Sequence, residues 1–327
     1  MYLEIEHRLS FAYDAYIRES FLELRMQPKT TPHQALSSFV LAVGPPTKVS
    51  RYRDWNDNTV HHFTIVNFHD RIEVSARSLV STAGEGPGLG AADARSATDV
   101  PYPLLDFLDF GGPVRNSPAL RKFAQAVSVP AGVTLGEVVG AYGRHIRSHF
   151  AYRKNVTRYD STTDDFLQIE AGVCQDFTHL MLGLLRLRQI PCRYVSGYLH
   201  VEQEDDGDVA QSHAWIEFYA PGAGWIPFDP THNREIDERY VVVGHGRHYD
   251  DVPPNKGIYR GNADEALEAQ VVTRPSMPKG ISALYEEMEQ IDVPVYPEIP
   301  ERRRDRGVLL IEDPTEQQQQ QQQRWAP

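Results

Sequence analysis

Residues 170–200 read EAGVCQDFTHLMLGLLRLRQIPCRYVSGYLH, and residues 211–233 read QSHAWIEFYAPGAGWIPFDPTHN. After Cys174, apolar residues recur at the spacing of one helix face, and Pro191 ends the pattern. The first part therefore predicts a helix with Cys174 in its first turn. Beyond it, residues 193–200, 213–220 and 225–229 are predicted strands, and the turn residues 221–224 join the last two into an antiparallel pair.

Cys174 occupies the place of a nucleophile. Free backbone N–H groups and the positive end of the helix dipole favour thiolate over thiol, so we expect its pKa to lie below that of an ordinary thiol. A nucleophilic thiol needs an imidazole to take its proton and a third group to orient that imidazole. His213 and Asp229 are available on the paired strands. Cys192 has no assigned base, and we expect it to be a core residue.

The register of the two strands decides whether His213 can meet Asp229. Side chains alternate between the faces of a sheet, so a shift of one residue moves a side chain to the other face. Pairing Ala220 with Trp225 would put His213 and Asp229 on opposite faces. Pairing Tyr219 with Trp225 makes them diagonal neighbours about 7–8 Å apart at Cα, within reach of a hydrogen bond. A triad therefore requires the second register or a bulge.

The strings GVCQDF, IPCRYVSGY, SHAW and GWIPFDPT resemble the transglutaminase-like superfamily, whose fold is related to papain-type thiol enzymes. In that family the triad runs Cys, His, Asp in chain order. The resemblance implies that Cys174 is the nucleophile, that His213 is the base and that Asp229 orients the base. It also implies acyl transfer from a carboxamide of a protein or peptide, including a glutamine side chain or an isopeptide bond, through a thioester on the cysteine.

Two alternatives stay open at this point. Water in place of an amine as the acyl acceptor would make the protein a peptidase or amidase. A protein-binding module on the same fold, without turnover, is the alternative from another class. The chemistry needs no cofactor, and no acidic cluster at calcium-ligand spacing is present. The expected partner is a protein or peptide substrate, and the oligomeric state stays open.

Residues near the triad have further candidate roles. Gln175 could add a donor close to the developing oxyanion, although the backbone N–H of Cys174 is the stronger candidate. Trp215 would exclude water from the histidine and aspartate pair. Tyr152 resembles an aromatic residue that lines the site wall in the family, and a packed core tyrosine is an equal alternative. Asp176 lies in the first helical turn, where a carboxylate stabilises the helix dipole.

The whole chain of 327 residues predicts about two domains of class α+β. Alternating apolar residues in short runs over residues 1–81 predict an antiparallel β-sandwich. The strings LELRMQP and DWNDNTVHHFTI resemble the N-terminal β domain that precedes many bacterial transglutaminase-like domains. We expect this domain at 1–95, the catalytic domain at 96–274 and a disordered, low-complexity tail at 275–327, which includes the run Gln317–Gln323.

Composition limits the location and the partners. The chain has 33 basic and 45 acidic residues, and this net charge of −12 disfavours nucleic acid and anionic membranes as partners. No apolar run is long enough for a membrane span, the N-terminal residues do not resemble a secretory signal, and two cysteines fit a reducing compartment. These features predict a cytoplasmic protein. No metal site is predicted, because the neighbours His61 and His62 would point to opposite faces of a strand.

Overall fold

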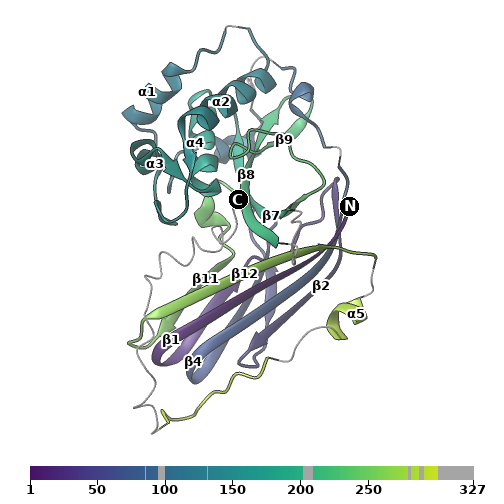
Figure 1. The fold of residues 1–327 in the computed structure, drawn as a ribbon, viewed down its shortest axis with the longest axis vertical. Helices are drawn as coiled ribbons and strands as arrows, with labels where there is room; N and C mark the ends of the chain where they lie inside the picture. The colour runs from purple at the N-terminus through teal and green to yellow at the C-terminus, as the bar shows by residue number, and fades with distance from the viewer. Residues whose placement is uncertain are drawn as a thin grey trace. The chain divides into compact units, whose positions relative to one another are not determined.

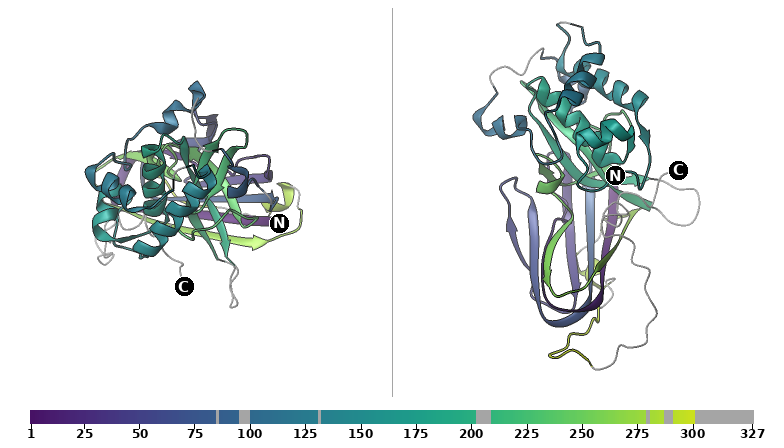
Figure 2. Two further views of the ribbon diagram at one scale, coloured as in Figure 1. Left: turned by 90° about the horizontal axis from the view of Figure 1, so that it is seen from above. Right: turned by 90° about the vertical axis from the view of Figure 1, so that its left-hand side faces the viewer.

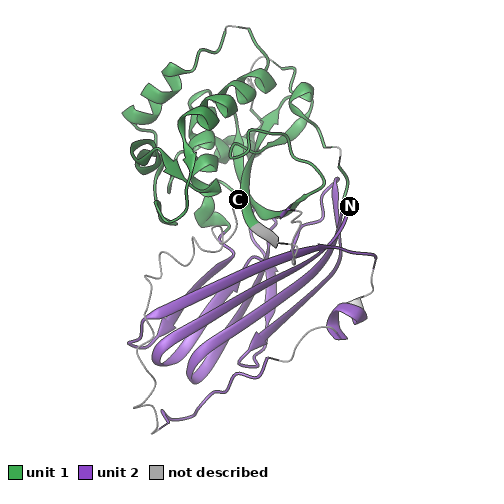
Figure 3. Ribbon diagram, viewed as in Figure 1, with its two compact units in different colours: residues 1, 82–199, 212–252 green, residues 2–81, 200–211, 253–327 purple. Residues whose placement is uncertain are grey.

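The computed structural model describes residues 1–84, 86–94, 100–130, 132–201, 209–278, 281–286 and 291–300. The chain divides into two compact units (Figure 3). Unit 1 contains Met1, Thr82–Leu199 and Ser212–Val252, and unit 2 contains Tyr2–Ser81, His200–Gln211 and the chain from Pro253 onward. Within the described ranges, every helix is too short or too polar to cross a membrane.

Unit 2 is an antiparallel β structure built around two very long strands. Its strands are β1 (Tyr2–Leu24), β2 (Gln34–Gly44), β3 (Ser50–Arg53), β4 (Thr59–Thr82), β11 (Asn255–Arg260) and β12 (Glu265–Pro275). The order is β12-β1-β4-β2, and β11 pairs with β1 while β3 pairs with β4. The turn between β3 and β4 places Asp57 at a positive φ of 57°, a conformation that Asp and Asn tolerate better than most residues.

The long strands bend back on themselves, which makes two layers out of the same strands (Figure 2). The register between β1 and β4 shifts twice between Ala12 and Glu19, where the strands curve. Alternate side chains from both halves then share one buried core, which includes Leu9 and Phe11 from the first half of β1 and Leu22 and Leu24 from the second. The expected N-terminal β-sandwich is confirmed.

The limits of the two units differ from those expected from the sequence. Strands β11 and β12 were expected in the catalytic domain at 96–274, and instead both pair with β1 in unit 2. The pairs between β1 and β12 run from Leu3 opposite Pro275 to Tyr13 opposite Glu265. From Glu19 onward, β1 pairs with β11 instead. A period of two identifies a strand but not its partner, and β1 is long enough to take two partners in succession on the same side.

Part of the segment expected to be a tail is folded. Helix α5 (Ile281–Glu286) contacts β2, and Leu284 is buried against Val40 and Leu79. Further on, the backbones of Tyr296 and Phe68 exchange two hydrogen bonds of 2.8 Å. Residues 281–286 and 291–300 therefore belong to unit 2, and the run Gln317–Gln323 lies outside the described residues.

Unit 1 consists of helices packed on strands (Figure 1). These strands pair in the order β10-β7-β8-β9. They are β7 (Cys192–Val201), β8 (Val209–Ala220), β9 (Gly224–Phe228) and β10 (Tyr240–Gly246), and a separate parallel pair is formed by β5 (Ala151–Tyr152) and β6 (Ala171–Gly172). The helices are α1 (Pro118–Ala126), α2 (Leu135–His149), α3 (Thr163–Ile169) and α4 (Cys174–Leu187).

Helix α4 is the centre of unit 1. All of its residues from Cys174 to Arg186 are buried, and α1, α2 and α3 each contact it. Its apolar side chains share one core with Ala214, Ile216 and Phe218 of β8. The α+β class is confirmed. At the start of α2, Thr134 and Glu137 form a capping box through hydrogen bonds of 2.7 and 3.2 Å.

Candidate active site

Cys174 is the first residue of α4, as the sequence predicts, and only 1% of its surface is exposed. Val173 before it has extended backbone angles, which ends the short strand β6 and starts the helix. The side chain of Asp176 holds the backbone at the point where β6 ends and α4 begins. It accepts hydrogen bonds from the backbone N–H of Val173 at 2.8 Å and from the hydroxyl of Thr157 at 2.7 Å. The cysteine is thus held at a rigid helix start.

The surroundings of the sulfur do not favour thiolate in the way that the sequence predicted. Burial raises the pKa of the Cys174 thiol to about 12, and hydrogen bonds from the backbone N–H groups of Ala214 and Gln175 offset only part of this effect. The expectation of a lowered pKa was wrong, because it counted the helix end and left out the loss of water around the sulfur. At neutral pH the thiol form predominates.

His213 lies on β8, directly before Ala214 in the sequence, and its side chain is 2% exposed. Strands β8 and β9 pair with Tyr219 opposite Trp225, which is the register that the triad required. Asp229 follows the last residue of β9, and its Oδ2 lies 2.8 Å from His213 Nε2. This hydrogen bond leaves Nδ1 as the ring nitrogen that can accept a proton.

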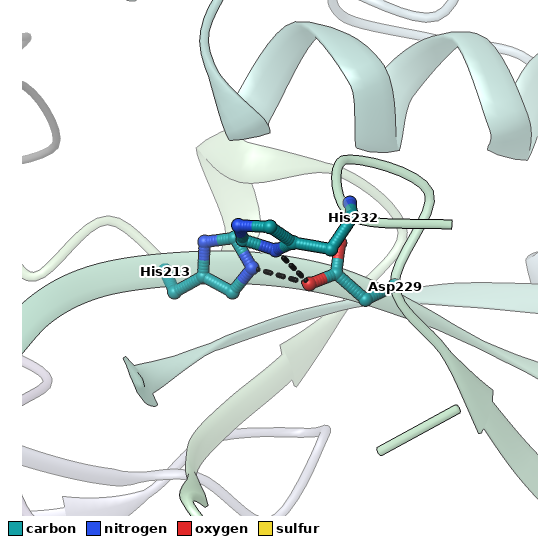
Figure 4. A group of neighbouring side chains, drawn as sticks. All are labelled: His213, Asp229 and His232. Atoms are coloured by element: carbon teal, nitrogen blue, oxygen red, sulfur yellow. Dashed lines mark hydrogen bonds and ion pairs between the residues drawn. The ribbon is translucent and has the colours of Figure 1, made fainter. Parts of the chain in front are cut away.

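Asp229 is fully buried and accepts hydrogen bonds from five donors, of which the two imidazoles are drawn in Figure 4. Oδ2 accepts from His213, from His232 Nδ1 at 2.7 Å and from the hydroxyl of Tyr240 at 2.8 Å. Oδ1 accepts from the backbone N–H groups of Thr231 at 2.8 Å and His232 at 3.3 Å. Burial alone would raise the pKa of Asp229, but the two histidines lower it below its ordinary value. The carboxylate is therefore ionised at neutral pH.

The sequence profile of the transglutaminase-like superfamily matches residues 121–230, which include Cys174, His213 and Asp229. The profile of the bacterial transglutaminase-like N-terminal region matches residues 3–81. The chain belongs to the transglutaminase-like superfamily.

The individual relatives of this transglutaminase-like protein include one without an assigned function and one that is named as an enzyme. An uncharacterised protein of Mycobacterium leprae is 32% identical over 278 residues, which cover 83% of this chain and 98% of the relative. A protein-glutamine gamma-glutamyltransferase of Pseudomonas aeruginosa is 26% identical over 161 residues, 46% of this chain and 24% of that protein. A crystal structure from Cytophaga hutchinsonii, provisionally assigned as a cysteine protease, has the same fold with a TM-score of 0.69 at 19% identity, over 86% of this chain and 93% of that one.

The other candidate residues lie around Cys174, His213 and Asp229. Gln175 donates its side-chain amide to the carbonyl of Tyr159 at 2.6 Å, so its backbone N–H, and not its side chain, is the group that contacts the sulfur. Tyr152 is partly buried on β5. Burial raises the pKa of its hydroxyl, and the charges of Cys174, Asp176 and Asp229 raise it further. Trp215 is fully buried, with its ring centroid 6.2 Å from that of His213.

Two residues of the site were missed by sequence reasoning. His232 follows Asp229 by three residues in a turn, and this spacing within DPTH was a usable signal. Tyr240 begins β10, which pairs with β7 and not with β8 or β9. The sheet order alone brings its hydroxyl to Asp229, and no local pattern in the sequence contains that information.

His213, Asp229 and His232 have ligand atoms within 4.8 Å of one another, as a metal site would require. The two contacts to Asp229 Oδ2 measure 2.8 and 2.7 Å. Two ligand atoms of one tetrahedral zinc ion lie farther apart, at roughly 3.3 Å, given zinc–ligand distances near 2 Å. We therefore interpret the group as a hydrogen-bond network.

Asp176 predicts a pH dependence of stability. Burial raises the pKa of its carboxyl group to about 7, above the ordinary value of 3.8. Between about pH 4 and pH 7 the unfolded chain releases a proton that the folded chain keeps, so wild-type stability falls as pH rises through this window, by on the order of 4 kcal/mol. Asp176→Asn keeps an oxygen acceptor but does not ionise. Urea unfolding of both proteins between pH 4 and pH 8 should show the variant gaining stability relative to wild type, and parallel curves would contradict the assignment.

Proposed function

We propose that this protein is a cysteine acyltransferase or hydrolase that attacks a carboxamide of a protein or peptide and forms a thioester on Cys174. One observation carries the proposal. The residue that hydrogen-bonds the cysteine sulfur, Ala214, directly follows a buried histidine that is held by an ionised carboxylate. A thiol, a base and an orienting acid on these elements have the composition of a cysteine-enzyme triad.

The raised pKa of the thiol determines the order of the proton transfers. Nδ1 of His213 accepts the proton of Cys174 as the sulfur attacks the carboxamide carbon, because little thiolate exists beforehand. The new imidazolium is stabilised by Asp229. The backbone N–H at the start of α4 is the candidate donor to the oxyanion. His213 then returns the proton to the leaving ammonia or amine, which leaves the thioester.

The second half of the reaction repeats these transfers with an acceptor. An amine or a water molecule gives a proton to His213 and attacks the thioester carbon, and the departing sulfur takes that proton back. An amine acceptor gives an amide or isopeptide product, and water gives the free acid. No metal or redox group takes part in either half.

A peptide assay tests the proposal and separates its alternatives. The protein is incubated with a glutamine-containing peptide, with and without a primary amine, and the peptide is followed by mass. Replacement of ammonia by the amine indicates a transferase, replacement by water indicates a hydrolase, and an unchanged peptide that binds the protein would favour the binding module. We also propose, from the composition of the chain, a cytoplasmic location and protein or peptide partners.

A further inference from the structure

Unit 2 contains a small pocket beside strand β3. Its volume is about 260 Å³, and the residues that line it are Gln27, Arg51, Tyr52, Arg53 and Thr59. Binding sites for whole small molecules usually measure roughly 300–1,000 Å³. The pocket is therefore suited to a single charged group or to the end of a longer chain.

The pocket lies along one edge of β3. Successive side chains of a strand point to opposite faces, so Arg51 and Arg53 share one face and Tyr52 lies on the other. Three consecutive residues can line the same pocket only if it runs along the edge of their strand. On one side β3 pairs with β4, with Arg53 opposite Thr59, and among the described strands no other pairs with it. The other edge of β3 is thus open to an added strand.

Two guanidinium groups give the pocket a positive charge. Arg51 makes no hydrogen bond or ion pair to the residues that the structure describes. Arg53 donates from Nη1 to the carbonyl of Asp57 at 2.9 Å and lies 3.6 Å from its carboxylate, with its side chain 56% exposed. A guanidinium has five N–H donors, so both arginines have donors left for an anion in the pocket.

The carboxylates nearby already have partners. Arg25 lies 3.5 Å from both Glu23 and Asp54, and Asp57 pairs with Arg53. None of these three carboxylates lines the pocket. The pocket itself therefore keeps its positive charge and favours an anionic ligand.

Gln27 adds a group of another kind to the pocket. It follows the end of β1, and its side-chain Oε1 is buried without a hydrogen bond to any described residue. A buried acceptor without a donor is destabilising, and a donor from a ligand removes that cost. The backbone N–H of an extended chain is such a donor. The ligand that fits the pocket thus has a negative charge and an N–H group close to it.

We propose that this pocket binds the C-terminal carboxylate of an extended polypeptide, whose last residues add as a strand to the open edge of β3. The carboxylate accepts hydrogen bonds from Arg51 and Arg53, and a backbone N–H of the added strand donates to Gln27. Main-chain hydrogen bonds at a strand edge supply affinity for many sequences, and the charge selects the end of the chain. This site lies in unit 2 and does not depend on any reaction at Cys174.

Calorimetry with two forms of one short peptide tests the role of the carboxylate. The peptide alternates valine and threonine, has a blocked N-terminus and ends in either a free carboxylate or an amide. We expect the acid form to bind at least about ten-fold more tightly than the amide form, because only the acid form has a negative charge for the two arginines. Equal affinity of the two forms, or no binding of either at millimolar concentration, would overturn the proposal.

Two substitutions change the pocket without removing a buried apolar group. Arg51 is exposed, so Arg51→Gln should leave urea unfolding unchanged. It should weaken binding of the acid peptide by about ten-fold and leave the amide peptide unaffected. Gln27→Glu keeps the size of the side chain and adds a negative charge, so it should weaken the acid peptide more than the amide peptide. Unchanged affinity for the acid peptide in both variants would contradict the assignment of this pocket.

Arg71→Gln is the matched control for charge. Arg71 lies on β4, its side chain is 58% exposed and 3.8 Å from Glu73, and it does not line the pocket. Its loss changes the net charge by the same amount as the loss of Arg51. Affinity for the acid peptide should stay within about two-fold of wild type. A loss as large as that in Arg51→Gln would mean that overall charge, and not this pocket, attracts the peptide.

Backbone amide NMR locates the peptide and separates it from free anions. The acid peptide should shift the amide signals of Ser50–Arg53 and slow their hydrogen exchange, because the added strand pairs with them. Acetate and inorganic phosphate should bind at least about ten-fold more weakly than the acid peptide, because they make no strand contacts. Free anions that bind as tightly as the peptide, or peptide binding that leaves the β3 signals unmoved, would overturn the assignment to a chain end.

Discussion

Replacing Cys174 with alanine is expected to lower kcat/KM by at least about 10³-fold, with the protein still folded. A nucleophile and its base act as a unit, so the loss of either one removes nearly the whole covalent route. The substitution deletes one buried sulfur, which costs on the order of 1–2 kcal/mol of stability. Steady-state kinetics and urea unfolding measure the two effects separately.

Cys192 provides the control for this experiment. It is as buried as Cys174, burial raises its pKa to about 11, and its sulfur contacts the carbonyl of Leu182 at 3.5 Å. Cys192→Ala should lose a similar amount of stability and keep its activity within a few-fold of wild type. Residual activity above about a tenth in Cys174→Ala, or an equal loss in both variants, would remove Cys174 from the role of nucleophile.

Asp229→Ala is expected to have the second-largest effect, on both activity and stability. The substitution leaves five donors in a buried site without their acceptor, among them His213, His232 and Tyr240. Loss of one side of such a network costs about 3–5 kcal/mol. Turnover should fall by on the order of 10³–10⁴-fold, because the imidazolium of His213 loses its stabilising charge and its orientation.

Asp229→Asn should lie between wild type and Asp229→Ala. The amide can still contact the ring of His213 but no longer stabilises its charged form. Asp251→Asn is the comparison, since Asp251 pairs with Arg247 in the same unit at 3.0 Å. That variant should lose some stability at unchanged kcat. A wild-type rate in Asp229→Ala would mean that another residue orients His213.

The strands and helices that carry the triad could be predicted because the relevant information is local. The helix after Cys174 is marked by its apolar face, and the parity of β8 and β9 separates a register in which His213 can meet Asp229 from one in which it cannot. In each case the physical cause acts over a few residues.

The features that the sequence did not predict depend on residues that lie far apart in the chain. The pKa of Cys174 depends on atoms that bury the sulfur from several elements, and the helix end alone gave the wrong direction. The place of β12 depends on which strand it pairs with, and Tyr240 reaches Asp229 only through the order of the sheet. Long-range packing decides these features, and the period of a single segment does not encode it.

The central claim is that Cys174 becomes acylated. Wild-type protein is mixed with a glutamine-containing peptide, quenched in acid within the first turnover, digested and mapped by mass. We expect a peptide adduct that lacks ammonia, located on Cys174, absent from Cys174→Ala and discharged when a primary amine is added before the quench. Turnover without any adduct on Cys174, or an adduct that persists in Cys174→Ala, would contradict it.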